Sequence, residues 1–234
     1  MGSKLSELMD VHDAQLFPGV SNTDLHTFSR SSKITLPDDH LAALNYSNGA
    51  TVYGGYTRLF GINAAGCVDS GEWNRFDYWK FAWERRCNNY FCFGETIWGD
   101  QYAYNIERLR QGDTRVYFLD WLSMSPEVVA PSFSGFLESE LIRIATAPYD
   151  IMMVRAREKF GDIDPENHLT YAPSLVIGGS EEVDNIVVLP SRVAMIFNGD
   201  IASQIDSAPE SSVIKAVVPY DDEAQRPRLR LIFS

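Results

Sequence analysis

The chain has 234 residues, of which 45% are hydrophobic, so it is long enough for one large domain or for one domain with a substantial extension. It carries 32 acidic against 20 basic residues, a formal net charge of −12. This net negative charge argues against direct binding of nucleic acid, because binding to phosphates depends on Lys and Arg side chains that release counterions. The charge favours a basic protein as the partner instead.

The N-terminal residues and the cysteines indicate an intracellular protein. Residues 1–13 have neither the basic start nor the apolar centre of a secretory signal, and no later stretch reaches the length of a membrane span. Cys67, Cys87 and Cys92 are an odd number without the spacing of a disulfide framework. We therefore predict a cytoplasmic protein with reduced thiols and no membrane partner.

In chain order, the first predicted elements are two helices and a strand. Residues 1–16 place apolar side chains on one side of a short helix. Leu36-Pro37-Asp38-Asp39 has the marks of a second helix start, since Pro suits the first turn and carboxylates face the positive end of the helix dipole. Asn48-Gly49 would end that helix, and Gly54-Gly55 would open a strand over residues 56–62.

The middle of the chain has the pattern of antiparallel strands followed by helices. Over residues 91–106 and 115–122, aromatic and β-branched residues alternate with polar ones around turns that contain Gly and Asp. Over residues 133–144, apolar residues recur at helical spacing, which predicts a long amphipathic helix that covers one face of the sheet. A further helix is predicted over residues 150–160.

The composition changes after residue 160, and the remainder is predicted to be rich in β-structure. Short apolar runs, separated by Gly, Pro, Asn or acidic residues, occur there at residues 175–177, 186–189, 193–197, 213–218 and 228–233. The last two runs would form a hairpin around an acidic loop.

These patterns predict a chain with two parts. Residues 1–160 would form a domain of antiparallel strands and helices, and residues 161–234 a β-rich C-terminal extension or small subdomain. Residues 161–214 contain nine carboxylates against Arg192 alone. Such a patch is either a solvated face that maintains solubility or a contact surface for a basic partner.

The sequence contains no coherent catalytic or metal-binding set. The four histidines are scattered, with no pair at the helical or strand spacing of a metal site. Two glycines in residues 94–100 have the outer spacing of a phosphate loop, but Asp100 stands where the motif needs a Lys. We predict no enzymatic activity, no cofactor and no metal, while a buried acid–base pair among the many carboxylates stays an alternative.

Several motifs together resemble the SUKH superfamily, the Smi/Knr-like domain. They occur in the family's order between residues 33 and 144: Leu36-Pro37, Asn48-Gly49, Thr57-Arg58-Leu59-Phe60-Gly61, Gly99-Asp100-Gln101-Tyr102, and Ser132-Phe133 through Phe136-Leu137. The tail is similar to a segment found behind such domains in some type VI secretion immunity proteins, at Phe160-Gly161, Tyr171-Ala172-Pro173 and Ile177-Gly178-Gly179.

The resemblance implies an α+β fold for residues 1–160, with helices packed around a single, mostly antiparallel sheet, and it also implies a function. In bacteria, such a protein is a cytoplasmic immunity protein that binds a cognate toxin, often a nuclease or deaminase, and blocks its active site. In fungi, the same domain is a regulatory scaffold for cell-wall synthesis, so a non-catalytic scaffold with an endogenous partner is the alternative. The family's motif positions are chiefly structural and supply no catalytic residue. The oligomeric state stays open.

A stretch dense in aromatic residues is the candidate for the partner surface. Twelve aromatic residues lie between Trp73 and Tyr104. Those from Tyr90 onward alternate as strand residues do and are predicted to fill the core. The earlier ones lie in residues 64–89, an insertion relative to the compact family pattern, among charged residues typical of a half-exposed surface. The predicted partner-binding residues, which would meet a basic toxin, are Glu72, Trp73, Asp77, Tyr78, Trp79, Trp83, Glu95 and Asp100.

Overall fold

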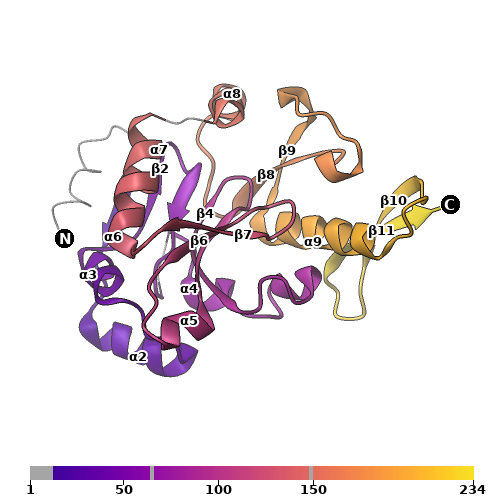
Figure 1. Ribbon diagram of the computed structural model, residues 1–234. Coiled ribbons are helices and arrows are strands. Elements are labelled where there is room, and N and C mark those ends of the chain that lie inside the picture. The colour runs from indigo at the N-terminus through magenta and orange to yellow at the C-terminus, as the bar shows by residue number, and fades with distance from the viewer. Residues whose placement is uncertain (1–12, 64–65, 148–149) are drawn as a thin grey trace.

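The computed structural model describes residues 13–63, 66–147 and 150–234. A seven-stranded sheet lies at the centre of the molecule, and its strands follow one another in chain order, each antiparallel to the next (Figure 1). They are β1 (Gln15–Pro18), β2 (Ser47–Val52), β3 (Thr57–Leu59), β4 (Tyr90–Thr96), β5 (Gln101–Asn105), β6 (Val116–Leu119) and β7 (Pro126–Ala130). The predicted α+β fold with a single antiparallel sheet is confirmed.

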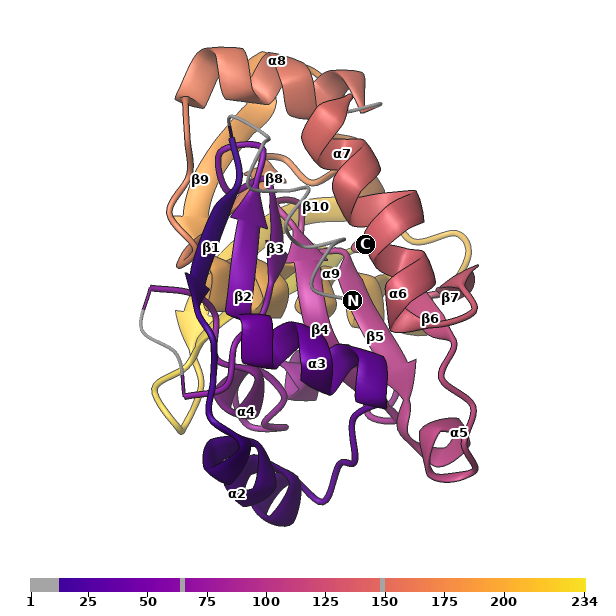
Figure 2. The ribbon, with the colours of Figure 1, turned by 90° about the vertical axis from the view of Figure 1, so that its left-hand side faces the viewer.

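Helices cover one face of this sheet (Figure 2). They are α3 (Asp38–Tyr46) and a continuous helical stretch made of α6 (Phe133–Phe136), the π-helical η2 (Leu137–Ile142) and α7 (Arg143–Thr146). The ring centroid of Phe93 in β4 lies 5.5 Å from those of both Phe133 and Phe136. The predicted core role of the strand aromatics is therefore confirmed, as is the amphipathic helix that covers them.

The opposite face lies under α9 (Ser191–Ser207) and under residues 70–83, which contain α4 (Ser70–Trp73) and the 3-10 helix η1 (Lys80–Trp83). A second core cluster fills the space between them and the sheet; its members include Phe60, Trp73, Trp79, Trp83, Cys92, Ala103, Met195 and Ile196. Both faces of the sheet are thus buried, which explains why the middle of β4 is apolar on successive residues.

Three further helices flank the sheet at its ends. At one end lie α2 (Asn22–Ser32) and α5 (Ile106–Arg110), and at the other lies α8 (Ile151–Phe160), which was predicted (Figures 1 and 2). The predicted helix start at residues 36–39 is also confirmed, because α3 begins at Asp38. Of the helix predicted over residues 1–16, residues 1–12 lie outside the described part of the chain, and the next element is the strand β1.

The C-terminal part consists of two hairpins with a helix between them. β8 (Asn167–Tyr171) pairs with β9 (Ile186–Pro190), and β10 (Ile214–Asp221) pairs with β11 (Pro227–Phe233), so the predicted terminal hairpin is confirmed. The 3-10 helices η3 (Leu175–Ile177) and η4 (Val183–Asn185) lie in the β8–β9 connection. Among the helices of the described residues, none combines the length with the apolar character that crossing a membrane requires.

The prediction that residues 193–197 form part of a β-rich tail is wrong, because they belong to the 17-residue helix α9. This helix contacts the second core cluster, η1 and β11 on different sides. Because these contacts surround it, apolar residues occupy most of its circumference. A helix that is buried nearly all round loses the periodic pattern that would identify it. Because α9 contributes Met195 and Ile196 to the second core cluster, the C-terminal part and the sheet share that cluster.

Candidate partner-binding site

Five of the eight predicted partner-binding residues lie inside the protein. Trp73, Trp79, Trp83, Glu95 and Asp100 are between 0% and 6% exposed. The expectation of a half-exposed surface is wrong for the three tryptophans, because α9 and the sheet enclose them. Glu72 and Asp77 are exposed, and Tyr78 is half-buried. The structure therefore brings only these last three to the surface, where they lie on one short stretch of chain.

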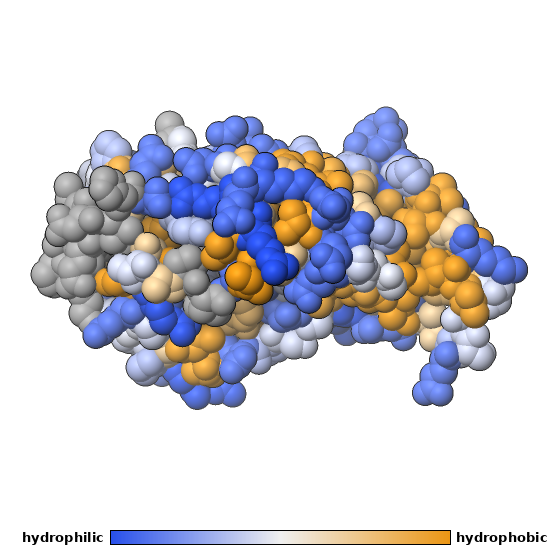
Figure 3. Space-filling model, turned by 90° about the horizontal axis from the view of Figure 1, so that it is seen from above, coloured by the Kyte–Doolittle hydropathy of each residue, from blue (hydrophilic) through white to orange (hydrophobic). Residues whose placement is uncertain are grey.

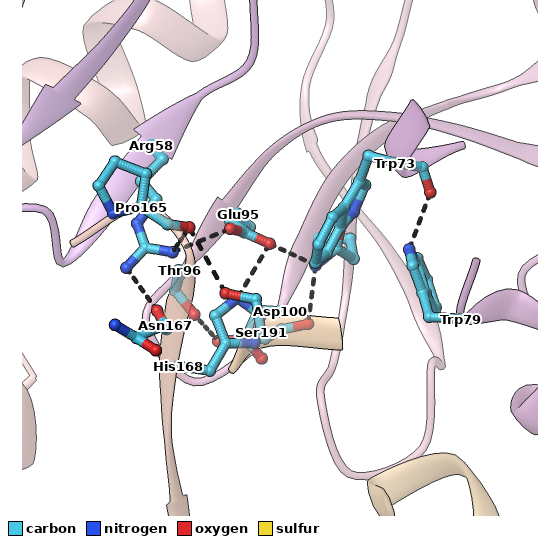
Figure 4. A network of polar contacts seen from close by, with 12 residues as sticks. Arg58, Trp73, Trp79, Glu95, Thr96, Asp100, Pro165, Asn167, His168 and Ser191 are labelled. Atoms are coloured by element: carbon cyan, nitrogen blue, oxygen red, sulfur yellow. Dashed lines mark hydrogen bonds and ion pairs between the residues drawn. The ribbon is translucent and has the colours of Figure 1, made fainter. Parts of the chain in front are cut away.

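The three buried indoles fix the insertion to its surroundings. Trp73 donates from Nε1 to Oε1 of Gln101 at 2.7 Å, and Trp79 donates to the carbonyl oxygen of Trp73 at 2.9 Å (Figure 4). Trp83 donates to the carbonyl oxygen of Met195 in α9 at 2.9 Å. Each indole is thus fully packed and hydrogen-bonded, which indicates that it holds the insertion in place.

Glu95 belongs to a buried polar node that joins the sheet to the C-terminal part (Figure 4). Its Oε1 accepts a hydrogen bond from Arg58 at 3.1 Å, and its Oε2 lies 3.1 Å from Nε2 of His168. Burial alone would raise the pKa of Glu95, but His168 and Arg58 outweigh it and hold that pKa below its usual value. Paired in this way, the carboxylate is a structural group.

Arg58 is the link in this node between the two parts of the chain. Its guanidinium donates to the carbonyl oxygens of Asp164 at 3.2 Å, Pro165 at 2.9 Å and Asn167 at 2.7 Å. Its Nε donates to the carbonyl oxygen of Gly55 at 2.8 Å. Arg58 is 1% exposed, so these bonds form away from water and hold residues 164–167 against β3.

Asp100 is buried in the turn between β4 and β5. Its carboxyl group accepts hydrogen bonds from Oγ1 of Thr96 at 2.5 Å and from the backbone nitrogen of Trp121 at 2.9 Å. Burial raises the pKa of Asp100 to about 7. The group shapes the turn and does not reach the surface.

The exposed part of the insertion forms a ridge, which we define as residues 70–86. Its exposed side chains include Glu72, Phe76 and Asp77, with Tyr78 half-buried beside them. Phe76 is 56% exposed, and sequence reasoning missed it as a partner-binding residue. In the sequence, the position of Phe76 between the charged residues Arg75 and Asp77 could have indicated its exposure. In the structure these two residues form an exposed ion pair at 2.7 Å.

A cleft of about 750 Å³ lies between the ridge and the C-terminal part. Its charged or aromatic lining residues that reach the surface are Asp69, Glu72, Tyr78, Asp164, Glu166 and Arg192. Four of these are carboxylates, and Arg192 is the one basic residue in the described lining. Its Nε donates to the carbonyl oxygen of Tyr78 at 2.9 Å, and its guanidinium lies 5.1 Å from the centre of the Tyr78 ring. We call this hollow the acidic cleft.

Apolar side chains are also exposed on the C-terminal hairpins, at Val187 and Val188 in β9 and at Val217, Val218 and Ile232 in β10 and β11. Figure 3 shows hydrophobic residues gathered toward the end of the molecule that β10 and β11 form. These side chains are aliphatic. The ridge instead combines an exposed aromatic ring with carboxylates beside a cleft, a composition closer to that of binding hot spots.

The described residues show neither a metal-ligating cluster nor a thiol with a lowered pKa at this cleft. No group of three or more His, Cys, Asp or Glu residues among them is arranged to hold a metal ion. Burial raises the pKa of the Cys67 thiol to about 11 and that of Cys87 to about 12, so both thiols are protonated near neutral pH. The arrangement is suited to binding a basic surface.

The chain resembles known proteins in fold and in sequence family. The crystal structure of Atu4351 from Agrobacterium tumefaciens superimposes with a TM-score of 0.57 at 10% sequence identity, covering 99% of this chain and 98% of that one. This likeness shows the fold, and it includes the C-terminal part. No curated protein matches the sequence. The family model described as the SMI1 / KNR4 family (SUKH-1) matches residues 19–139, just over half of the 234 residues. The chain therefore belongs to the SMI1/KNR4 family (SUKH-1).

Proposed function

We propose that this chain is a bacterial immunity protein that binds a cognate secreted toxin in the cytoplasm and neutralises it by protein–protein contact. The SMI1/KNR4 family includes immunity proteins, which supports the general class. The observation that carries the proposal is the acidic cleft, bordered by a ridge with an exposed aromatic ring. The partner would be basic, such as a nuclease or a deaminase whose active site binds nucleic acid.

The charges of the cleft match such a partner. Glu72, Asp164 and Glu166 are exposed carboxylates at its wall, and they lie on two separate segments of the chain. An enzyme that binds nucleic acid presents Lys and Arg side chains to phosphates. The same side chains would meet these carboxylates, which would speed the encounter and block the substrate path.

Phe76 would supply the anchor for tight binding. An exposed aromatic ring loses little conformational entropy on binding and buries a large apolar area. Truncating such an anchor typically costs about 2 kcal/mol of binding free energy, or about 30-fold in Kd. Because Phe76 is 56% exposed, its loss should leave folding stability nearly unchanged.

Co-expression with a candidate toxin from a neighbouring gene tests the proposal. The wild-type chain is expected to restore growth and to co-purify with the toxin. Phe76→Ala and Glu166→Lys should weaken the complex, while the matched controls Tyr46→Ala on α3 and Glu127→Lys on β7, also exposed, should not. No rescue and no co-purification by the wild-type chain would remove the immunity function and favour the regulatory scaffold with an endogenous partner.

A further inference from the structure

We infer that α9 is the positioning element of the proposed partner surface, and that it holds the ridge in one conformation through a close contact at Gly199 and a hydrogen bond from Ser203. The expected effect on partner binding rests on the proposed function. The positioning of the ridge by α9 does not, so it can be tested without any toxin.

Hydrogen bonds join α9 to the ridge at several points along the helix. Near its start, Arg192 donates to the carbonyl oxygen of Tyr78 at 2.9 Å. One turn later, the carbonyl oxygen of Met195 accepts from Trp83 at 2.9 Å. Two turns beyond, Oγ of Ser203 donates to the carbonyl oxygen of Ala82 at 3.0 Å. The helix therefore fixes backbone and side-chain groups over the second half of the ridge.

Gly199 lets the helix and the ridge approach each other closely. A Cβ atom at this position would lie 2.9 Å from the carbonyl carbon and oxygen of Ala82 and 2.9 Å from Cδ1 of Trp83. Such distances are too short for a methyl group, so the ridge would have to move. Glycine is unfavourable in the interior of a helix, and α9 nevertheless has it near the middle of its 17 residues. The close contact accounts for the glycine.

The ridge needs an external support because its own elements are very short. α4 and η1 have four residues each, far below the length at which an isolated helix is stable. The residue after η1, Glu84, has φ 54° and ψ −113°, a conformation that non-glycine residues adopt only when the surroundings impose it. The ridge conformation thus depends on the surface against which it docks.

A fixed ridge has a direct consequence for binding. Tyr78, Asp77 and Phe76 lie just before η1, and the Tyr78 carbonyl is itself held by Arg192. If α9 keeps these residues in place before the partner arrives, binding costs less conformational entropy. Variants that loosen the ridge should therefore weaken binding although they touch no residue of the binding surface.

Hydrogen exchange of full-length variants tests this inference. In Gly199→Ala, amides of residues 76–86 are expected to exchange at least about tenfold faster, while those of β4 and β5 keep their rates. Ser203→Ala should show a smaller effect, about two- to tenfold, for the loss of one hydrogen bond. The matched control is Ser207→Ala, because Oγ of Ser207 bonds to the carbonyl oxygen of Ser203 within α9. This control should leave the ridge amides unchanged.

Each outcome decides a separate claim. Unchanged ridge exchange in both variants would overturn the inference, and so would equal acceleration throughout the sheet, which would show that α9 supports the whole fold and not the ridge in particular. Ser203→Ala serves if Gly199→Ala fails to fold. A looser ridge with unchanged toxin affinity would overturn the positioning role in binding. If the wild-type chain binds no toxin, the proposed function fails, whereas faster exchange restricted to the ridge still supports α9 as its positioning element.

Discussion

Replacing Asp100 by Asn is expected to stabilise the protein at pH 8 and to remove part of the pH dependence of its unfolding. Asp100 is 6% exposed, and burial raises its pKa from 3.8 to about 7. An Asn side chain has nearly the same shape and is neutral at every pH. Its carbonyl oxygen can accept from the Trp121 nitrogen and its amide can donate to Thr96, so both hydrogen bonds have a counterpart.

The sign of the effect follows from proton binding. Between about pH 4 and pH 7 the folded protein keeps a proton on Asp100 that the unfolded chain has released. The free energy of unfolding contributed by this group is therefore highest below pH 4, falls as the pH rises through this window, and stays low above it. A shift of about three pKa units, at 1.36 kcal/mol each, corresponds to a loss on the order of 4 kcal/mol.

Urea unfolding, followed by tryptophan fluorescence at pH 5, 6, 7 and 8, measures this contribution. The stability of the Asn variant relative to the wild type should rise with pH and level off above pH 7. Asp184→Asn is the control, since the side chain of Asp184 is 98% exposed. A difference between Asp100→Asn and the wild type that does not change with pH, or a variant less stable than the wild type at pH 8, would refute the reasoning.

Three further predictions concern the core, the polar node and the charge. Trp79→Ala should cost about 3–5 kcal/mol in urea unfolding, because the indole is fully buried, and a loss below 1 kcal/mol would contradict its core role. Arg58→Leu should cost about 3–5 kcal/mol, because the buried Glu95 loses the guanidinium and keeps only His168 and Gln101, and it should speed proteolysis within residues 161–190. Association with the toxin should slow as salt rises, by stopped-flow measurement, with Glu166→Lys weakening the salt dependence; a rate independent of salt would exclude steering by the cleft.

The strands of the sheet were predictable because the alternation of their side chains can be seen within short stretches of sequence. Phe91, Phe93, Tyr102 and Tyr104 alternate within single strands, and the helix that covers them carries Phe133 and Phe136 at helical spacing. The strand β7 was missed because it is short and begins with Pro126 and Glu127, two residue types that are depleted in strands. The helix α2 was missed in a Ser/Thr-rich stretch, although Ser21 accepts from the nitrogen of Asp24 at 3.2 Å, a pair that marks a helix start.

The partner-binding residues were harder to predict because their burial depends on residues far along the chain. Trp79 and Trp83 have charged neighbours, which suggested a half-exposed surface, but α9 lies over them from more than 100 positions later. Lys80 shows the same effect, since it is 4% exposed and its Nζ donates to the carbonyl oxygen of Tyr90 at 2.7 Å. A buried lysine with a carbonyl partner leaves no pattern in the local sequence.

The acidic cleft is assembled from two regions that lie far apart in the chain. Glu72 and Tyr78 come from the ridge, inside the family match, whereas Asp164, Glu166 and Arg192 come from beyond residue 139, where that match ends. Arg58, within the matched region, holds residues 164–167 in place and so joins that wall of the cleft to the sheet. Under the proposed function, the sheet would serve as the frame, and partner choice would depend on the ridge and the C-terminal part together. Transferring one region alone to a related domain would then supply only one wall of the cleft, and with it only part of the charge that a basic partner meets.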